Sequence, residues 1–377
     1  MSFRSLRLSD ALLQALADNN YTKATPIQER AIPAIRSGND VLGIAKTGSG
    51  KTAGFVLPIL MNYRMSAQLP NRHVSVLVLV PTRELAVQVQ EVFHTFSSAL
   101  PSPIKSMAVF GGVSINPQMI KLQGVRILVA TPGRLIELVE SKSVHLSEVK
   151  TLVLDEADKM LNMGFKDEVD RILAMLPAER QNLLISATLS DQLQDVQRVM
   201  LRNPSVIKIV EENTNIDLIQ QTAYHVLPEK KGPLLRHLIK SQNLRQVLIF
   251  CSAQRTADQL AKKLRQNKIQ VQVTHGKKSQ EARTSALRAF KAGDLHVLVA
   301  TDLISRGIDI EFLPCVINYE LPRSPKDYIH RIGRTGRAEN PGQAISFITP
   351  DDLHHFKVIQ KKMGKWVKLT YSEDMEF

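Results

Sequence analysis

Eight residues, from Ala45 to Thr52, combine the side chains and the spacing that bind phosphate. They read Ala-Lys-Thr-Gly-Ser-Gly-Lys-Thr, after a short apolar run that starts at Val41. Glycines let backbone N–H groups point at an anion, a lysine reaches the outer phosphates, and a threonine hydroxyl can bind Mg²⁺. The alternative is a Gly/Ser turn between a strand and a helix, and the first position is Ala45 where the general pattern has glycine. We predict phosphate or nucleotide contacts along the whole loop: Ala45, Lys46, Thr47, Gly48, Ser49, Gly50, Lys51 and Thr52.

A second group of chemically active residues is the acidic tetrad Asp155-Glu156-Ala157-Asp158, which follows the apolar run 151–154. In a chain with a phosphate loop, the first acid is suited to Mg²⁺, directly or through water. The adjacent acid can orient or deprotonate an attacking water. The alternative is an acidic helix start, since carboxylates favour helix N-termini. The preceding loop and strand favour the metal and water roles.

A third group is cationic. The stretch His330-Arg331-Ile332-Gly333-Arg334-Thr335-Gly336-Arg337 places three arginines in eight residues, with Arg306 and Asp309 upstream. Such arginines can stabilise charge that develops on a γ-phosphate. A contact surface for a nucleic-acid backbone, or a solvated basic turn, remains an alternative.

These groups must be positioned by a layered fold. Apolar, β-rich runs alternate with helical patterns, and polar groups follow the runs directly, which indicates buried parallel sheets with ligands at the carboxyl ends of the strands. The alternation of apolar runs and helical patterns stops around residues 203–217. It then resumes, without a second glycine-rich lysine loop. At 377 residues the chain fits two domains. We predict an α/β fold with domains at residues 1–206 and 218–377 and a linker at 207–217.

Composition sets broader limits. A hydrophobic content of 44% and a charged content of 23% are typical of a globular protein. The net charge of +13 and the pI of about 9.7 favour a polyanionic partner. Cys251 and Cys315 each lie in an apolar run, so we expect buried free thiols, a reducing cytoplasmic compartment and no membrane span.

The C-terminal residues 363–377 show no clear element in the sequence. They hold Trp366, the only tryptophan, close to several lysines. One interpretation is a contact with RNA; the one we favour is a packed anchor on a basic helix.

Taken together, seven motifs resemble those of the DEAD-box ATP-dependent RNA helicases, in order and approximate spacing, from about Phe3 to about Pro350. The motifs are 45–52, 81–86, 131–134, 155–158, 186–188, 301–309 and 330–337. The resemblance implies two tandem RecA-like domains, each a mainly parallel sheet flanked by helices, which close over ATP, Mg²⁺ and one RNA strand.

The resemblance also assigns roles in the ATP site. Gln28 would read adenine, which agrees with the ability of an amide to bond adenine N6 and N7 together, and Phe3 would support that pocket. Lys51 and Thr52 would hold phosphates and Mg²⁺. The remaining implied roles are Mg²⁺ binding by Asp155, water activation by Glu156, ribose contact by Asp309, γ-phosphate contact by Arg334 and Arg337, and coupling of hydrolysis to unwinding by Ser186 and Thr188.

Contacts with RNA follow from the same resemblance. Hydroxyls, backbone N–H groups and arginines suit phosphate and 2′-OH contacts, which read no base sequence. Aromatic residues make up only 5% of the chain, so base-stacking platforms are scarce. The implied RNA-binding residues are Arg83, Gly112, Thr131, Arg134, Thr274, Gly276, Thr301 and Arg306.

The sequence therefore predicts a monomeric, cytoplasmic, RNA-dependent ATPase that separates short RNA duplexes or remodels RNA–protein complexes. Two alternatives stay open: an ATP-gated RNA clamp or chaperone, and a DNA-translocating motor. The opening Ser2-Phe3-Arg4-Ser5-Leu6 and the short core look most like the bacterial RhlE-like group, which implies ribosome assembly or RNA turnover and protein partners from those processes.

Overall fold

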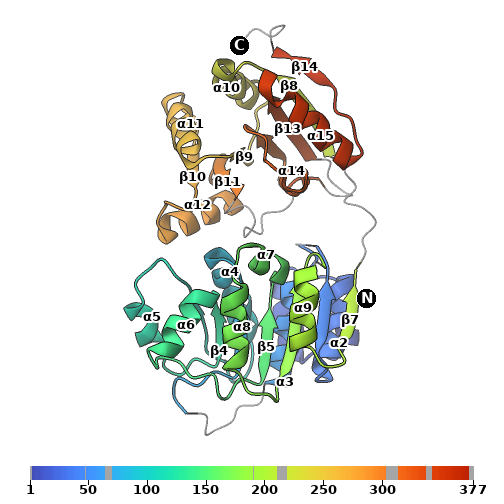
Figure 1. Ribbon diagram of the computed structural model, residues 1–377, viewed down its shortest axis with the longest axis vertical. Helices are drawn as coiled ribbons and strands as arrows, with labels where there is room; N and C mark the ends of the chain where they lie inside the picture. Colours follow the sequence, from blue (N-terminus) through green and yellow to red (C-terminus); the bar gives the residue numbers. More distant parts are fainter. Residues whose placement is uncertain are drawn as a thin grey trace. The chain divides into compact units, whose positions relative to one another are not determined.

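The computed structural model describes residues 2–46, 48–63, 70–189, 191–209, 219–302, 313–336 and 342–372. Two compact units make up the chain, Met1–Val210 and Glu211–Phe377. Each unit is a parallel β-sheet with helices packed on both of its faces (Figure 1).

The first sheet has seven parallel strands among the described residues, in the order β3-β4-β2-β5-β6-β1-β7. Its inner strands are short apolar runs buried on both faces, because helices cover the sheet from either side. The strands are β1 (Val41–Ile44), β2 (Val76–Leu79), β3 (Ser106–Val109), β4 (Ile127–Ala130), β5 (Thr151–Leu154), β6 (Gln181–Ser186) and β7 (Ser205–Lys208).

Two apolar cores lie on opposite faces of this sheet. Val76 and Val78 of β2 belong to one core, and Leu77 and Leu79 belong to the other, as the alternation of a strand requires. The first core is covered by η1 (Phe3–Leu6), α1 (Asp10–Asp18), α2 (Pro26–Arg36), α3 (Lys51–Asn62) and α4 (Arg83–Ser98). The second is covered by α5 (Asn116–Lys121), α6 (Pro132–Glu140), α7 (Ala157–Asn162), α8 (Lys166–Ala174) and α9 (Asp191–Met200).

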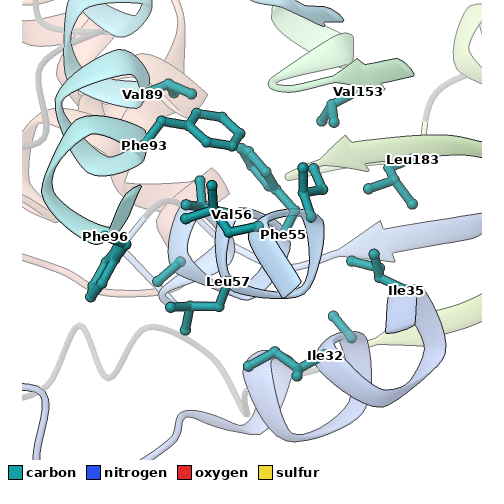
Figure 2. Close-up of a cluster of buried hydrophobic side chains, with 14 of the residues drawn as sticks. Ile32, Ile35, Phe55, Val56, Leu57, Val89, Phe93, Phe96, Val153 and Leu183 are labelled. Atoms are coloured by element: carbon teal, nitrogen blue, oxygen red, sulfur yellow. The ribbon is translucent and has the colours of Figure 1, made fainter. Parts of the chain in front are cut away.

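Helix α3 is apolar around most of its circumference because it is packed between other elements. Figure 2 shows Phe55, Val56 and Leu57 of α3 among side chains of α2, α4, β5 and β6. The rings of Phe55 and Phe93 lie 6.3 Å apart between centroids. Truncating such a buried phenylalanine to alanine lowers the free energy of unfolding by about 3–5 kcal/mol. The packing of Phe55 therefore stabilises the helix that begins at Lys51.

The second sheet also has seven parallel strands in the described part of the chain, in the order β10-β11-β9-β12-β13-β8-β14. Counted from its own first strand, this is the order of the first sheet. The strands are β8 (Ile219–His225), β9 (Val247–Cys251), β10 (Val271–Thr274), β11 (Val297–Thr301), β12 (Cys315–Asn318), β13 (Gly342–Ile348) and β14 (Leu369–Tyr371). The helices are η3 (Pro228–Lys230), α10 (Lys231–Ser241), α11 (Gln254–Gln266), α12 (Gln280–Ala292), α14 (Pro325–Ile332), η4 (Pro350–Asp352) and α15 (Leu353–Met363). The repeated topology confirms the predicted pair of RecA-like sheets.

Three observations correct or complete the sequence analysis. Strand β7 pairs with β1 and runs to Lys208, so the first sheet continues past residue 206, where we placed the end of the first domain; residues 210–218 lie outside the described part. Strand β14 occupies the C-terminal stretch in which we expected no element. Trp366 is 69% exposed and follows α15, so the prediction of a packed anchor on a helix is wrong.

The two cysteines agree with their prediction. Cys251 and Cys315 are buried and free, and burial raises the pKa of the Cys315 thiol to about 12. Among the described residues, no helix is long and apolar enough to span a membrane.

Candidate active site

The predicted phosphate loop joins the end of β1 to the start of α3. Gly48 and Gly50 have φ of +79° and +88°, in the left-handed region that glycine tolerates. A Cβ on Gly50 would lie 2.5 Å from Nε2 of Gln28, so only glycine fits beside that amide. The Ser49 hydroxyl donates to the Lys46 carbonyl oxygen at 2.8 Å and tightens the turn. Thr47 lies outside the described residues.

Lys51 is the first residue of α3 and is buried at 8% exposure. Its Nζ donates to the Ala45 carbonyl oxygen at 2.5 Å, so the side chain folds back over its own loop. Burial lowers the pKa of Lys51 from its usual value, although the carboxylates of Asp155 and Glu156 act in the opposite direction. A cation that is desolvated in this way gains from an added anion such as phosphate.

The acidic tetrad follows β5, two strands from β1 in the sheet order. Asp155 is 2% exposed, and burial raises its pKa to about 6 against the opposing effect of Lys51. The backbone N–H of Glu156 donates to Asp155 Oδ1 at 2.9 Å. Glu156 has φ of +51°, a conformation that costs energy in a non-glycine residue and concentrates at functional sites.

The two carboxylate oxygens of Glu156 have different surroundings. Lys159 Nζ lies 2.7 Å from Oε1, whereas Oε2 is buried and has no hydrogen-bond partner among the described residues. A buried acceptor without a partner is costly unless a ligand or a water supplies a donor. Lys159 was not identified from the sequence; it holds the carboxylate so that Oε2 remains available.

The residues present fit a magnesium ion. The carboxylate of Asp155 and the hydroxyl of Thr52, the second residue of α3, are hard oxygen ligands of the kind Mg²⁺ prefers. No group of three or more His, Cys, Asp or Glu side chains in the described ranges could hold a metal by itself. Mg²⁺ usually keeps several waters and binds few protein ligands together with substrate phosphates.

Ser186 and Thr188 connect the end of β6 to the tetrad. Thr188 donates to Asp158 Oδ2 from its hydroxyl at 2.6 Å and from its backbone N–H at 3.1 Å. The Ser186 hydroxyl donates to the Thr188 carbonyl oxygen at 2.8 Å. Burial by itself would raise the pKa of Asp158, but the polar contacts with Thr188 and Ser186 outweigh it and hold that pKa below its usual range.

Gln28 is 1% exposed and connects two segments of the site. Its Oε1 accepts from the Thr25 backbone N–H at 2.9 Å, and its Nε2 donates to the Gly50 carbonyl oxygen at 3.0 Å. Each end of the amide therefore keeps one further hydrogen-bonding position. Phe3 is buried in η1 with its ring 6.5 Å from that of Tyr21, and its support of an adenine pocket stays a prediction.

The four RNA-contact candidates of the first unit are brought together in part. The guanidinium of Arg83 lies against Gly112, where an added Cβ would come 1.8 Å from one of its nitrogens. Burial, followed by the positive charge of Arg134, lowers the pKa of Arg83. Arg134 donates to the Val113 carbonyl oxygen and to Glu137 at 2.8 Å each.

This group also has an unmet hydrogen-bonding capacity. One terminal nitrogen of Arg134 is buried without a partner among the described residues. Thr131 is the N-cap of α6 and is 9% exposed, so the positive end of the helix dipole lies at its side. Two neighbouring cations and a helix N-terminus favour a shared anion.

In the second unit Thr274 and Thr301 are the last residues of β10 and β11. Because these strands are parallel neighbours, both residues lie at the carboxyl ends of the strands, close to each other. His275, which we did not single out, is 1% exposed and fixes the loop that carries Gly276. Its Nε2 lies 3.0 Å from Asp258 Oδ2, and its Nδ1 accepts from the Lys277 backbone N–H at 3.3 Å. A buried, satisfied histidine beside a chemical motif has no distinctive sequence signal.

The arginines of the third motif differ from one another. Arg331 is 2% exposed and donates to both oxygens of Asp302, at 2.6 and 2.7 Å, with its guanidinium 4.9 Å from the centre of the Phe250 ring. It therefore joins α14 to the end of β11 and is not available to a ligand. Arg334 follows α14 and is half-buried. Arg306, Asp309 and Arg337 lie outside the described residues.

Comparison with known proteins now decides the family. Residues 25–196 match the model of the DEAD/DEAH box helicases, and residues 230–339 match that of the helicase conserved C-terminal domain. The chain is 38% identical over 362 residues to the ATP-dependent RNA helicase CshA of Limosilactobacillus reuteri, covering 96% of this chain and 72% of that protein. This chain belongs to the DEAD-box ATP-dependent RNA helicases.

Further relatives support the same family. The DEAD-box ATP-dependent RNA helicase CshA of Geobacillus kaustophilus is 37% identical, covering 100% of this chain and 80% of that protein. Among solved structures, S. cerevisiae Dbp5 bound to RNA and ADP BeF3 is 30% identical, with a TM-score of 0.83 and coverage of 98% of this chain and 95% of that one. A DEAD box protein from Methanococcus jannaschii is 35% identical, with a TM-score of 0.55 and coverage of 98% and 99%.

Membership of the DEAD-box family confirms the expected enzyme class, an RNA-dependent ATPase. The bacterial relatives described above carry the name CshA, so the narrower resemblance to the RhlE-like group stays a prediction. Membership of the family does not by itself give the role of each residue in this chain.

Proposed function

We propose that this DEAD-box helicase uses RNA-stimulated ATP hydrolysis to separate short RNA duplexes or to remodel RNA–protein complexes. One observation carries the proposal: buried Lys51 and the two buried acids Asp155 and Glu156 share one end of the first sheet, with Oε2 of Glu156 unpartnered among the described residues. A nucleoside triphosphate with its metal and a water would satisfy all three groups.

The phosphates of ATP would be held by the loop. In this role Lys51 exchanges its bond to the Ala45 carbonyl oxygen for a phosphate oxygen, which relieves the cost of its burial. The N-terminus of α3 adds its positive dipole. Thr52 and Asp155 would hold Mg²⁺, which neutralises charge on the transferred phosphoryl group.

Glu156 would act as the general base. Lys159 orients the carboxylate through Oε1, and Oε2 accepts a proton from the attacking water. The strained backbone of Glu156 is a cost that supports this role, because such residues persist where the surrounding structure holds them for a purpose.

The adenine base would be read by Gln28. The second N–H of its amide can donate to adenine N7 and the second lone pair can accept from N6. Because the same amide already binds the Thr25 and Gly50 backbone, adenine binding and the shape of the phosphate loop are linked. Phe3 would support the base, and Asp309 would contact the ribose.

RNA would bind through its backbone. In the first unit the neighbouring positive charges of Arg83 and Arg134, with Gly112 beside Arg83 and Thr131 at the N-terminus of α6, suit a phosphate and the adjacent 2′-OH groups. Thr274, Gly276, Thr301 and Arg306 would serve in the second unit. A contact surface of this kind reads no base sequence.

Hydrolysis would be coupled to RNA through two further sets of residues. Arg334 and Arg337 would stabilise charge on the γ-phosphate when ATP and RNA are both bound. Thr188, which bonds Asp158 directly, and Ser186, which bonds Thr188, would transmit the change at the acids to the rest of the first unit. We propose a role in ribosome assembly or RNA turnover, for a monomer in the cytoplasm, which accords with its two buried free thiols.

The test is the ATPase rate with and without single-stranded RNA, for the wild type and for Glu156→Gln, with the exposed Glu91→Gln as a matched control. We expect RNA to stimulate the wild type and the control, and the Glu156 variant to lose about 10²–10⁴-fold. No stimulation by RNA, or undiminished hydrolysis by Glu156→Gln, would overturn the proposal.

A strand-displacement assay on a short RNA duplex distinguishes a helicase from an ATP-gated clamp. Displacement supports a helicase, whereas stimulated hydrolysis without displacement supports an ATP-gated clamp. Equal stimulation by single-stranded DNA would favour a DNA motor.

A further inference from the structure

Trp366 lies in a short connection that the structure holds rigidly. Helix α15 ends at Met363, and Gly364 closes it in the left-handed region with φ of +74°. A few residues later the chain enters β14, which pairs in parallel with β8. The segment is therefore fixed at both ends.

A hydrogen bond and apolar packing also fix the middle of this connection. The backbone N–H of Val367 donates to Gln360 Oε1 at 2.7 Å, and Gln360 itself is buried. Val367 and Leu369 pack against the apolar cluster beneath α14 and α15. Because side chains alternate along an extended chain, Trp366 and Lys368 are directed to the opposite side, and both are exposed.

The exposure of Trp366 is unusual for its residue type. Tryptophan normally buries much of its large surface, and its side chain is 69% exposed here although its neighbours are well ordered by hydrogen bonding and packing. An indole exposed on a segment that is fixed at both ends offers a platform on which a nucleic-acid base can stack.

The sequence on both sides of the platform is rich in lysine and lies between the acidic pairs Asp351-Asp352 and Glu373-Asp374. Between Leu353 and Ser372 the sequence has five lysines and no aspartate or glutamate. Lys361, Lys362 and Lys368 are exposed. Lys362 is four residues from Trp366, so their Cα atoms lie within about 14 Å, and Lys368 is two residues away. The adjacent strand β8 has no charged Lys, Arg, Asp or Glu residue.

We propose that Trp366 with Lys361, Lys362 and Lys368 forms a second binding site for single-stranded RNA. A base would stack on the indole, and the lysines would hold the phosphates on either side of it, as in sites that combine aromatic platforms with cationic surfaces. The choice of RNA as ligand rests on the proposed function; an acidic peptide or an anionic membrane surface is tested as an alternative.

This Trp366 site lies far from the other RNA-contact candidates of its own unit. Strand β14 is at one edge of the second sheet, whereas β10 is at the other edge, six strand intervals away. At about 4.8 Å for each interval, this separation is about 29 Å. A short RNA would therefore fill only one of the two sites, and a long RNA could bind both.

The first experiment uses the indole itself. Because the chain has one tryptophan, its intrinsic fluorescence reports this site alone. We expect a long oligouridylate to quench it, and polyglutamate or vesicles of anionic phospholipid to leave it unchanged. No response to RNA, or an equal response to polyglutamate or to the vesicles, would contradict base stacking at Trp366.

The second experiment compares variants by the anisotropy of labelled RNA. Trp366→Ala should bind the long oligouridylate about tenfold more weakly, and Trp366→Phe should restore most of that loss. Lys361→Gln with Lys362→Gln should reduce the dependence of log K on log salt by about 0.7 for each phosphate contact removed. Lys240→Gln, an exposed lysine on α10, is the matched control. Wild-type affinity in Trp366→Ala would overturn the proposal.

One further measurement separates this proposal from the proposed function. ATP hydrolysis stimulated by a short RNA should be unchanged in Trp366→Ala. The RNA that stimulates hydrolysis binds the site proposed above, and a short RNA bound there cannot also reach Trp366. If the wild type shows no RNA stimulation, the proposed function fails. If stimulation is normal but Trp366 does not respond to RNA, only the second site fails.

Discussion

Lys51 and Lys231 occupy the same place in two sheets of the same strand order. Each is the first residue of the helix that follows the first strand of its unit, β1 before α3 and β8 before α10. Lys51 is 8% exposed and Lys231 is 7% exposed, and burial lowers the pKa of both. Topology alone therefore does not distinguish them.

Their surroundings do distinguish them. Lys51 follows a loop with two left-handed glycines and lies near the carboxylates after β5. Lys231 follows the turn η3, donates to the Tyr319 carbonyl oxygen at 3.0 Å, and has its Nζ 5.6 Å from the centre of the Tyr319 ring. Tyr319 follows β12, which corresponds to β5. The same fold thus carries the proposed phosphate site in one unit and, in the other, a buried lysine that contacts a carbonyl oxygen and a ring.

The strongest test of this comparison asks what the second unit contributes to catalysis. We expect Arg334→Gln to lower the RNA-stimulated kcat by about 10³-fold, because an arginine that stabilises γ-phosphate charge contributes that much or more. ATP binding to the first unit should persist. Steady-state ATPase kinetics and binding of a fluorescent ATP analogue measure the two quantities.

The neighbouring Arg331→Gln is the informative contrast. Arg331 is buried against Asp302, so its loss should lower the free energy of unfolding by about 3 kcal/mol. If Arg334→Gln retains wild-type kcat, the second unit supplies no catalytic arginine at this position.

Replacing each of the two lysines tests the comparison directly. Lys51→Met should lower kcat/KM for ATP by about a hundredfold or more, because a preorganised charge on the phosphates is removed. Lys231→Met should stay within a few-fold of the wild type, since its Nζ donates to a carbonyl oxygen and lies over the Tyr319 ring. A comparable loss of activity in a folded Lys231→Met protein would show that the second lysine also acts on the nucleotide.

The glycine beside each lysine gives a smaller effect. Gly50→Ala places a Cβ 2.5 Å from Gln28 Nε2 and forces alanine into φ of +88°. The left-handed conformation alone costs about 1–2 kcal/mol, so we expect ATP to bind about tenfold more weakly, as measured by calorimetry. In Gly232→Ala the nearest atom is the end of Arg236 at 3.7 Å, and this variant should bind ATP normally.

Much of this arrangement could be predicted from the sequence. Apolar runs followed at once by polar residues place Lys51, Asp155 and Thr188 at strand ends, and parallel strands bring their ends to one edge. The positions of the loop, the acids and the second sheet follow from that rule.

What could not be predicted depends on contacts between distant residues. Arg331 and Arg334 belong to the same cationic motif, and no local sequence pattern separates their roles. The hydrogen bonds of Arg331 to the Asp302 carboxylate identify it as a structural arginine. Lys159, His275 and the exposure of Trp366 likewise depend on which face of an element meets the core. The twin bonds of Thr188 to Asp158 connect residues 30 positions apart, beyond any local pattern.

Two threonines at corresponding positions of the two sheets also differ in their partners. Thr188, after β6, donates through its hydroxyl and its backbone N–H to Asp158 of another segment. Thr349, after the corresponding β13, makes the same two bonds to Asp352, only three residues away. We expect Thr188→Val to lower the free energy of unfolding of the first unit by about 1.5–3 kcal/mol, because a bond to a buried charged group is lost. Thr349→Val removes a local cap worth about 1 kcal/mol.

The two effects can be measured separately, because the one tryptophan lies in the second unit. Trp366 fluorescence should detect only Thr349→Val, and the transition seen by circular dichroism but not by fluorescence should shift in Thr188→Val. Since the folded pKa of Asp158 is below its usual value, its stabilising contribution is present above the unfolded pKa of about 3.9 and is lost as pH falls through the folded pKa. The stability gap between Thr188→Val and the wild type should therefore be widest near neutral pH and narrow below about pH 4. A gap that stays constant across that range would mean that the hydroxyl acts on packing and not on the charge of Asp158.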